Sequence, residues 1–135
     1  MPTPHTLGNH IKKKRTEQHM TQVALGALWG VDNNTITLWE RGKASPLVQY
    51  YPAIITFLGY YPFDHEIESI SGKLRQLRYC GGHTYVQCGT LLEVDQFTVR
   101  NWEHYPYTCP LPMHERILFL WSQIPKCLTQ PYRSI

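Results

Sequence analysis

The apolar residues between Thr21 and Glu40 recur at helical spacing in two short blocks. Three apolar residues set the spacing of the first block, namely Val23, Leu25 and Leu28. In the second block, Ile36 and Trp39 lie three residues apart and can face inward together. The pattern predicts two short helices that follow one another closely.

A sharp turn is predicted between the two blocks, because Gly30 tolerates a backbone in which a Cβ would clash. Val31 is expected to fill the angle between the helices. Asp32 is a good N-cap, since its carboxylate can accept from the N–H groups of Asn34 or Thr35. This layout leaves one face of the second helix pointing outward, made of Asn33, Asn34, Thr37 and Leu38. Such a face is what a recognition helix presents to the major groove of DNA.

The same run resembles the Cro/C1-type (XRE) helix-turn-helix domain of phage repressors and bacterial regulators. The matching positions are Thr21-Gln22, Gly26, Leu28, Gly30-Val31, Ile36 and Trp39-Glu40-Arg41-Gly42-Lys43, with Pro46 after them. The resemblance implies that Gln22 bonds a DNA phosphate and that Asn33 and Asn34 enter the major groove. It also implies an Arg15–Glu40 ion pair that braces the first helix of the domain against the recognition helix.

The flanking segments complete a small bundle. Residues 6–18 are predicted to form the preceding helix, with Leu7 and Ile11 on one face. Pro52 interrupts the later apolar run, so a helical turn at 47–50 and a last core helix at 52–58 are expected. Residues 1–60 are predicted to be the DNA-binding domain, and residues 61–69 a linker.

The chain repeats itself, without a gap, at a shift of 63 residues, as Arg15 and Arg78 illustrate. The other identical pairs are Thr21/Thr84, Val23/Val86, Gly26/Gly89, Leu28/Leu91, Val31-Asp32/Val94-Asp95, Thr35/Thr98 and Trp39-Glu40/Trp102-Glu103. Because these are core and turn positions, residues 70–124 are predicted to be a second, degenerate copy, followed by a C-terminal tail at 125–135. The predicted fold is all-α, with two tandem lambda-repressor-like helix-turn-helix bundles.

The second copy departs from the first at informative positions. Tyr85 stands where the first copy has Gln22, and Glu93 replaces the turn glycine, so that this turn needs a different backbone or carries strain. Arg78 and Glu103 remain, so an equivalent ion pair can form.

Charge also separates the two copies. Up to Phe63 there are six Lys/Arg against three Asp/Glu, and from Asp64 onward there are seven of each. Because neutralisation of phosphates supplies most non-specific affinity for DNA, the first copy is the better equipped of the two. The basic run at 12–15 is either a solvated helix face or a set of phosphate contacts.

The residues predicted to contact DNA divide into two groups. Asn33, Asn34, Thr37 and Leu38 would face bases, since an asparagine amide can bond adenine N6 and N7 together. Gln22, Arg41 and Lys43 would hold phosphates. In the second copy, Gln96 and Arg100 hold equivalent outward positions, and Arg100 could address a guanine. The alternatives are that the two asparagines only cap the helix and that Gln22 is an ordinary exposed residue.

Composition excludes several other classes of protein. No segment approaches the roughly 20 apolar residues of a membrane span, and no apolar run follows Met1 as in a signal peptide, so a cytoplasmic, nucleoid-associated protein is expected. The four cysteines contain no C-x-x-C pair and are expected to be free thiols; the alternative is a zinc half-site at Cys80 and His83. No nucleophile is visibly paired with a base, so neither an enzyme nor a cofactor is predicted.

Two functional hypotheses follow. The first is a sequence-specific transcriptional regulator that binds double-stranded DNA through the recognition helix of the first copy, either as a homodimer or with both copies of one chain. The second is a helix-turn-helix scaffold that mainly binds protein, antitoxin-like or associated with a mobile element, with the second copy as the surface for the protein partner.

Overall fold

The computed structural model describes residues 6–131. Residues 1–5 of the predicted first domain and 132–135 of the predicted tail lie outside this range. The described chain forms eight α-helices and three short 3-10 helices. They are α1 (Leu7–Glu17), α2 (Gln22–Trp29), α3 (Asn33–Glu40), η1 (Val48–Tyr50), α4 (Tyr51–Leu58), α5 (Ile70–Gly81), α6 (Tyr85–Leu92), α7 (Gln96–His104), η2 (Pro106–Thr108), α8 (Leu111–Ser122) and η3 (Lys126–Leu128).

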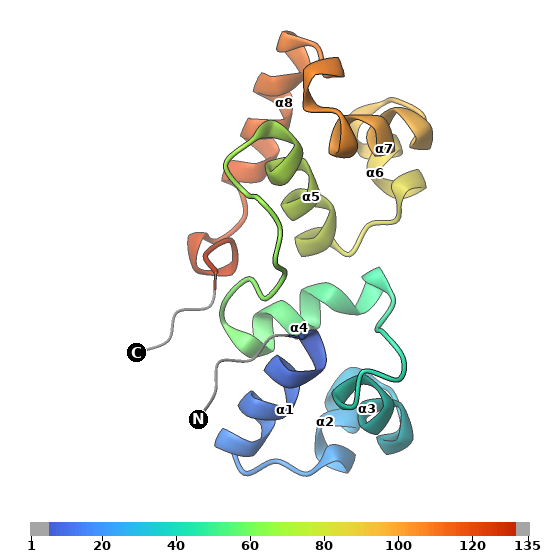
Figure 1. The fold of residues 1–135 in the computed structure, drawn as a ribbon, viewed down its shortest axis with the longest axis vertical. Coiled ribbons are helices and arrows are strands. Elements are labelled where there is room, and N and C mark those ends of the chain that lie inside the picture. The colour runs from blue at the N-terminus through green and yellow to red at the C-terminus, as the bar shows by residue number, and fades with distance from the viewer. Residues whose placement is uncertain (1–5, 132–135) are drawn as a thin grey trace.

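The helices form two four-helix bundles that follow one another along the long axis of the molecule, as Figure 1 shows. The first unit, α1–α4, encloses a core of Ile11, Leu25, Ile36, Trp39, Ile54 and Leu58. The second unit, α5–α8, encloses a separate core of Leu74, Leu77, Cys88, Leu92, Val99, Trp102, Cys109 and Ile117. The predicted all-α class with tandem bundles is confirmed. Within residues 6–131, no helix is long and apolar enough to cross a membrane.

Side-chain caps explain where the helices begin. Thr21 accepts from the N–H of Ala24 at 3.0 Å, and Asp32 accepts from the N–H of Thr35 at 2.8 Å. The equivalent caps of the second unit are Thr84 and Asp95. Of the two partners expected for the Asp32 carboxylate, Thr35 is the one that donates.

The turn between α2 and α3 needs two glycines for different reasons. Gly30 has φ +73°, the left-handed conformation that glycine adopts without a steric penalty. Gly26 packs so closely that a Cβ would overlap the carbonyl oxygen of Val31, and Gly89 meets Val94 in the same way. The crossing of the two helices therefore depends on a position without a side chain.

Burial in α2 is narrower than its apolar pattern suggests. Leu25 is fully buried, whereas Val23 is 65% and Leu28 62% exposed. The helix has only eight residues and meets the core through Leu25, Gly26 and part of Trp29. Helical spacing thus located the helix but did not separate its core positions from its surface positions.

The two units are in direct contact. Helix α4 packs against α5, and the ring of Tyr51 meets Tyr79 edge-on with their centroids 4.9 Å apart. Phe63 fills the space beside both rings, at 4.5 Å from Tyr51 and 4.8 Å from Tyr79. The segment predicted as a linker therefore packs against both units.

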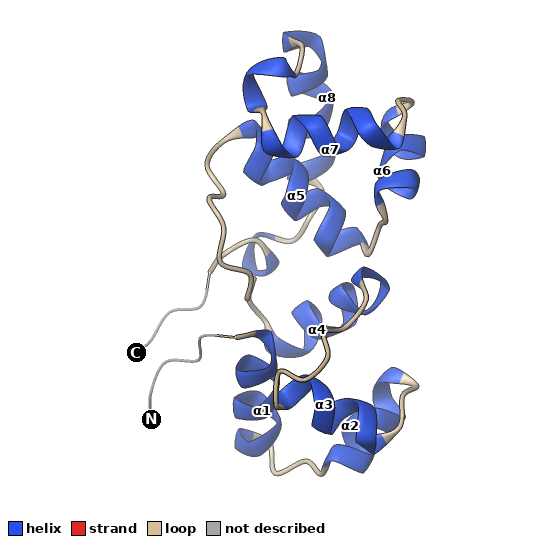
Figure 2. Cartoon of the chain, turned by 45° about the vertical axis from the view of Figure 1, so that its right-hand side comes forward, coloured by secondary structure: helices blue, strands red, loops and turns tan. Residues whose placement is uncertain are grey.

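The chain beyond α8 returns to this junction. The N–H of Tyr61 donates to the carbonyl of Gln130 at 2.7 Å, and the side chain of Gln76, fully buried, donates to the carbonyl of Thr129 at 2.9 Å. Trp121 donates its indole N–H to Gln76 at 2.8 Å. Residues 126–131 are consequently part of the packed structure rather than a free tail (Figure 2).

The turn of the second unit keeps the backbone of the first and is strained. Glu93 has φ +62°, a value close to the φ of Gly30, so a residue with a Cβ occupies the left-handed region.

We expect Glu93→Gly to raise the free energy of unfolding by about 1 kcal/mol, which urea denaturation would measure. Gly30→Ala should lower it by a similar amount. Arg116→Ala is the control for the exposed Arg116–Glu93 ion pair. A lower stability of Glu93→Gly would contradict the strain.

Candidate nucleic-acid interface

The exposed face of α3 is polar at its start and basic just beyond its end. Asn33, Asn34, Arg41 and Lys43 are exposed, and Leu38 is 45% exposed. The opposite face holds Ile36 and Trp39 in the core, which fixes the direction in which the polar side chains project.

An ion pair fixes α3 relative to α1. The guanidinium of Arg15 donates twice to the buried carboxylate of Glu40, through Nε at 2.7 Å and Nη2 at 2.9 Å. Its Nη1 also donates to the carbonyl of Met20 at 2.9 Å. The hydrogen bond with Glu40 raises the pKa of Arg15. One guanidinium thus joins α1, the loop after it and the end of α3.

Gln22, the first residue of α2, is attached to the same carboxylate. Its Nε2 donates to Glu40 at 3.1 Å, and its Oε1 accepts from the hydroxyl of Thr37 at 2.7 Å. Because a carboxylate only accepts, the NH₂ group must face Glu40, and one of its two N–H bonds remains available. Gln22 lies in a surface hollow whose other lining residues are Lys12, Arg15, Thr37, Glu40 and Arg41.

Thr37 is turned inward compared with the sequence-based expectation. It is half-buried, and its hydroxyl lies 2.7 Å from Gln22 Oε1 and 2.9 Å from the carbonyl oxygen of Asn33. The hydroxyl proton is therefore used inside the protein, where it holds the Gln22 amide in place.

A comparison with known families identifies this unit. Residues 11–65 match the family model described as Helix-turn-helix. The first unit is a helix-turn-helix domain. The match supports the resemblance to the Cro/C1-type domain and, in general terms, a DNA-binding regulator. It ends before α5, so it assigns no family to the second unit. Searches of curated proteins and of solved structures gave no match.

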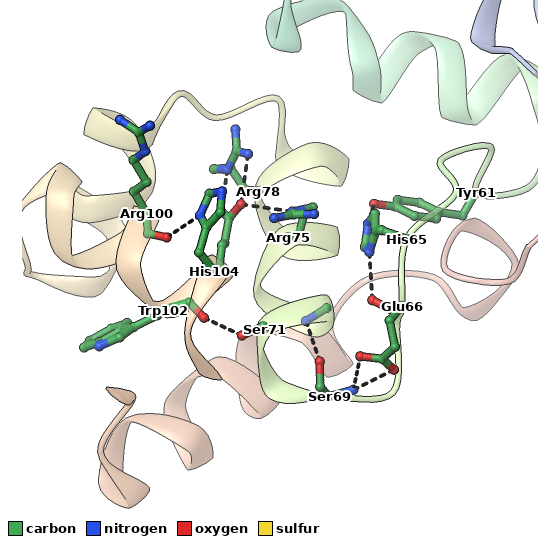
Figure 3. A network of polar contacts seen from close by, with 12 residues as sticks. Tyr61, His65, Glu66, Ser69, Ser71, Arg75, Arg78, Arg100, Trp102 and His104 are labelled. Carbon is green, nitrogen blue, oxygen red and sulfur yellow. Dashed lines mark hydrogen bonds and ion pairs between the residues drawn. The ribbon is translucent and has the colours of Figure 1, made fainter. Parts of the chain in front are cut away.

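The second unit contains an ion pair equivalent to Arg15–Glu40, and each of these two ion pairs is called a brace below. The residues around it differ from those in the helix-turn-helix domain. Arg78 donates to Glu103 through Nε at 2.6 Å and Nη2 at 3.1 Å, and Arg75 donates to the same carboxylate at 3.2 Å (Figure 3). Burial alone would lower the pKa of Arg78, but its hydrogen bond and ion pair with Glu103 raise it. Tyr85, in the place of Gln22, lies under the Arg78 guanidinium at 4.1 Å. A ring has replaced the amide, and among the described residues no hydrogen bond from Tyr85 to Glu103 replaces the one from Gln22 to Glu40.

The outward face of α7 is exposed and mixed in character. Gln96, Arg100 and Asn101 are exposed, and Phe97 is 66% exposed. Figure 3 places the Arg100 guanidinium away from the Arg78 side chain. Phe97 occupies the register of Asn34, and sequence reasoning missed it; the shift of 63 residues would have identified it.

The cysteines do not gather with other metal-ligating groups. Among the described residues, no set of three or more His, Cys, Asp or Glu side chains could hold a metal ion. All four cysteines are unpaired, and burial raises the pKa of Cys80 and of Cys88 to about 12. A thiol with such a pKa is a poor nucleophile at neutral pH.

The brace predicts a clear effect on stability. Glu40→Gln should lower the free energy of unfolding by about 2 kcal/mol, because Arg15 loses its partner but keeps partial access to water. Glu17→Gln is the matched control, since it removes the ion pair of Lys13 with an exposed carboxylate and should cost much less stability. Equal losses of unfolding free energy for the two variants in urea denaturation would show that the Arg15–Glu40 ion pair stabilises the fold no more than an exposed ion pair does.

Proposed function

We propose that the chain is a sequence-specific transcriptional regulator that reads DNA through α3 of the helix-turn-helix domain. The supporting observation is that the side-chain amide of Gln22 is hydrogen-bonded within the protein, whereas those of Asn33 and Asn34 have no such bond among the described residues. The Gln22 amide is held in place by Glu40 and Thr37, as a fixed anchor requires. The side-chain amides of Asn33 and Asn34 form no hydrogen bond with the other described residues, as base-reading groups require.

This contrast also weighs against the capping alternative. The N-cap of α3 is Asp32, whose carboxylate accepts from both the N–H and the hydroxyl of Thr35. The amides of Asn33 and Asn34 are therefore not needed to begin the helix and can bond adenine edges in the major groove. Arg41 and Lys43, exposed after the end of α3, suit the flanking phosphates.

Gln22 is suited to a phosphate on the other side of the groove. It is the first residue of α2, where backbone N–H groups and the helix dipole favour an anion, and its spare N–H adds a donor. Lys12 and Arg41 border the same hollow with positive charge. A phosphate bound there would fix the position of α3 in the groove.

A protein-binding scaffold is the second candidate, and the exposed aromatic residues of the second unit favour it. Tyr105 is 51% and Tyr107 83% exposed, and Tyr105 lines the same surface hollow as the exposed Phe97. Exposed aromatic side chains are enriched at protein interfaces.

Two substitutions separate the reading of bases from anchoring. Asn34→Ala should weaken binding to a selected sequence about tenfold and leave non-specific binding unchanged, because one bidentate base contact is lost. Gln22→Ala should weaken both. Fluorescence anisotropy on selected and random duplexes would measure this, with Asn9→Ala as the control, an exposed asparagine outside α2 and α3. If neither substitution changes either affinity, the assignment of the two residues is wrong.

Salt dependence distinguishes the two candidate functions. If Lys12, Arg41 and Lys43 each neutralise a phosphate, affinity for DNA should fall about 40-fold between 50 and 200 mM salt. Lys43→Ala should reduce the slope of log K against log salt by about 0.9. A partner held by an apolar interface would show almost no dependence on salt.

A further inference from the structure

The contact between the two units is made by non-equivalent surfaces. Helix α4 of the first unit meets α5 of the second, and α5 corresponds to α1, not to α4, under the shift of 63 residues. The contact is close, since a Cβ on Gly82 would lie 2.8 Å from Pro52 Cγ. A two-fold axis would bring the same surface of both units together, whereas contact between different surfaces repeats the units head to tail.

The arrangement of the helices agrees with this polarity. In Figure 1, α1 and α5 both run from the upper to the lower part of their units. In Figures 1 and 2, α2 and α3 lie on the same side of the long axis as α6 and α7. The two candidate recognition helices, α3 and α7, are therefore carried on one side of the molecule and in the same sense.

The junction is built to keep this arrangement. Tyr51, Phe63 and Tyr79 form a continuous aromatic contact between the units. Tyr61 is 1% exposed and hydrogen-bonded to Gln130, and Gln76 is buried against Thr129. The linker and the last described residues thus hold each other in place, which limits rotation of one unit against the other.

We propose that one chain binds two unlike half-sites in direct repeat on one face of DNA, an inference that rests on the proposed function. A homodimer with two-fold symmetry selects a palindrome, because symmetry of the protein imposes symmetry on the site. A head-to-tail pair presents α3 and α7 with the same polarity to the same strand.

The size of the units sets the spacing. Two compact units of about 60 residues in contact have centres about 27 Å apart by the scaling of the radius of gyration. One turn of B-DNA is about 34 Å and two turns are about 68 Å. The half-sites are therefore centred about 10 base pairs apart.

The second half-site differs from the first because the exposed residues of α7 differ. Arg100 replaces Thr37, and its exposed side chain, which has no hydrogen bond or ion pair with the other described residues, is suited to the O6 and N7 atoms of guanine. Phe97 replaces Asn34, and a phenyl ring suits the methyl group of thymine. Guanine and thymine are thus expected in the second half-site, beside an adenine that Gln96, in the register of Asn33, can still bond.

The second unit depends on its attachment to the first. Arg75 and Arg78 are both bound to Glu103, and Arg116 lies beside Glu93. Three of the six Lys and Arg side chains described in residues 64–131 are thus paired with carboxylates, which lowers the affinity of this unit alone for phosphates. A short connection raises its effective concentration at the neighbouring groove into the millimolar range, where weak base contacts add to the affinity.

Selection of bound sequences from random DNA with the full chain tests the proposal. We expect two different motifs in direct orientation about 10 base pairs apart, bound by one chain. Moving them apart by 5 base pairs should lower affinity at least tenfold, to that of the first motif alone, because α7 then faces the wrong side of the duplex. Arg100→Ala should remove the enrichment of the second motif only, and Arg116→Ala, an exposed arginine outside α7, should not.

The other outcomes overturn the proposal in distinguishable ways. An inverted repeat bound by two chains would mean that a conventional dimer forms and that α7 does not read DNA. A single motif that Asn34→Ala abolishes would leave the proposed function standing and assign the second unit another role, such as binding protein. No enriched sequence at all would overturn the proposed function as well.

Discussion

The carboxylate of Glu40 is the point on which the geometry of the first unit depends. It accepts from Arg15 on α1 and from Gln22 on α2, and it belongs to α3 itself. Three helices are thereby related through two oxygen atoms. Ion pairs removed from water add little net stability, because desolvation offsets most of the attraction, but they penalise any arrangement in which the partners separate. The Arg15–Glu40 ion pair is therefore best understood as a constraint on the angle of α3.

The second unit separates what the fold needs from what DNA binding needs. Arg78 and Glu103 preserve the brace, and Arg75 strengthens it. The amide that would face a phosphate is gone, and Tyr85 packs on the guanidinium in its place. The two units also pack differently near the start of α1 and of α5. The main chain of Trp39 lies so close to Gly8 that a Cβ has no room, whereas Ser71 at the equivalent position donates its hydroxyl to the carbonyl of Trp102. Packing is retained by different chemistry, while the hydrogen bond between Gln22 and Glu40 has no counterpart from Tyr85 among the described residues.

The parts of the fold that local chemistry determines could be predicted from the sequence. The α2–α3 turn followed from Gly30 and Asp32, and the start of α4 from Pro52, because caps, turns and proline act within a few residues. Long-range packing could not be predicted in this way. The inward turn of Thr37 depends on Gln22, fifteen residues earlier, and the burial of Gln76 depends on Thr129, beyond α8. Neither partner is marked by periodicity or by spacing.

Connectivity explains why the units meet head to tail. The chain leaves the first unit from the end of α4 and enters the second at α5, so a short linker brings these two helices together before any other pair. Separate chains have no such bias and close by two-fold symmetry. The proposed pairing of α3 and α7 within one chain would therefore replace a symmetric pair of recognition helices by a polar one. The exposed residues of α7 differ from those of α3, as Phe97 and Arg100 illustrate. The ion pair between arginine and glutamate, which is present in both units, then holds α3 and α7 each at its own angle while their exposed faces differ.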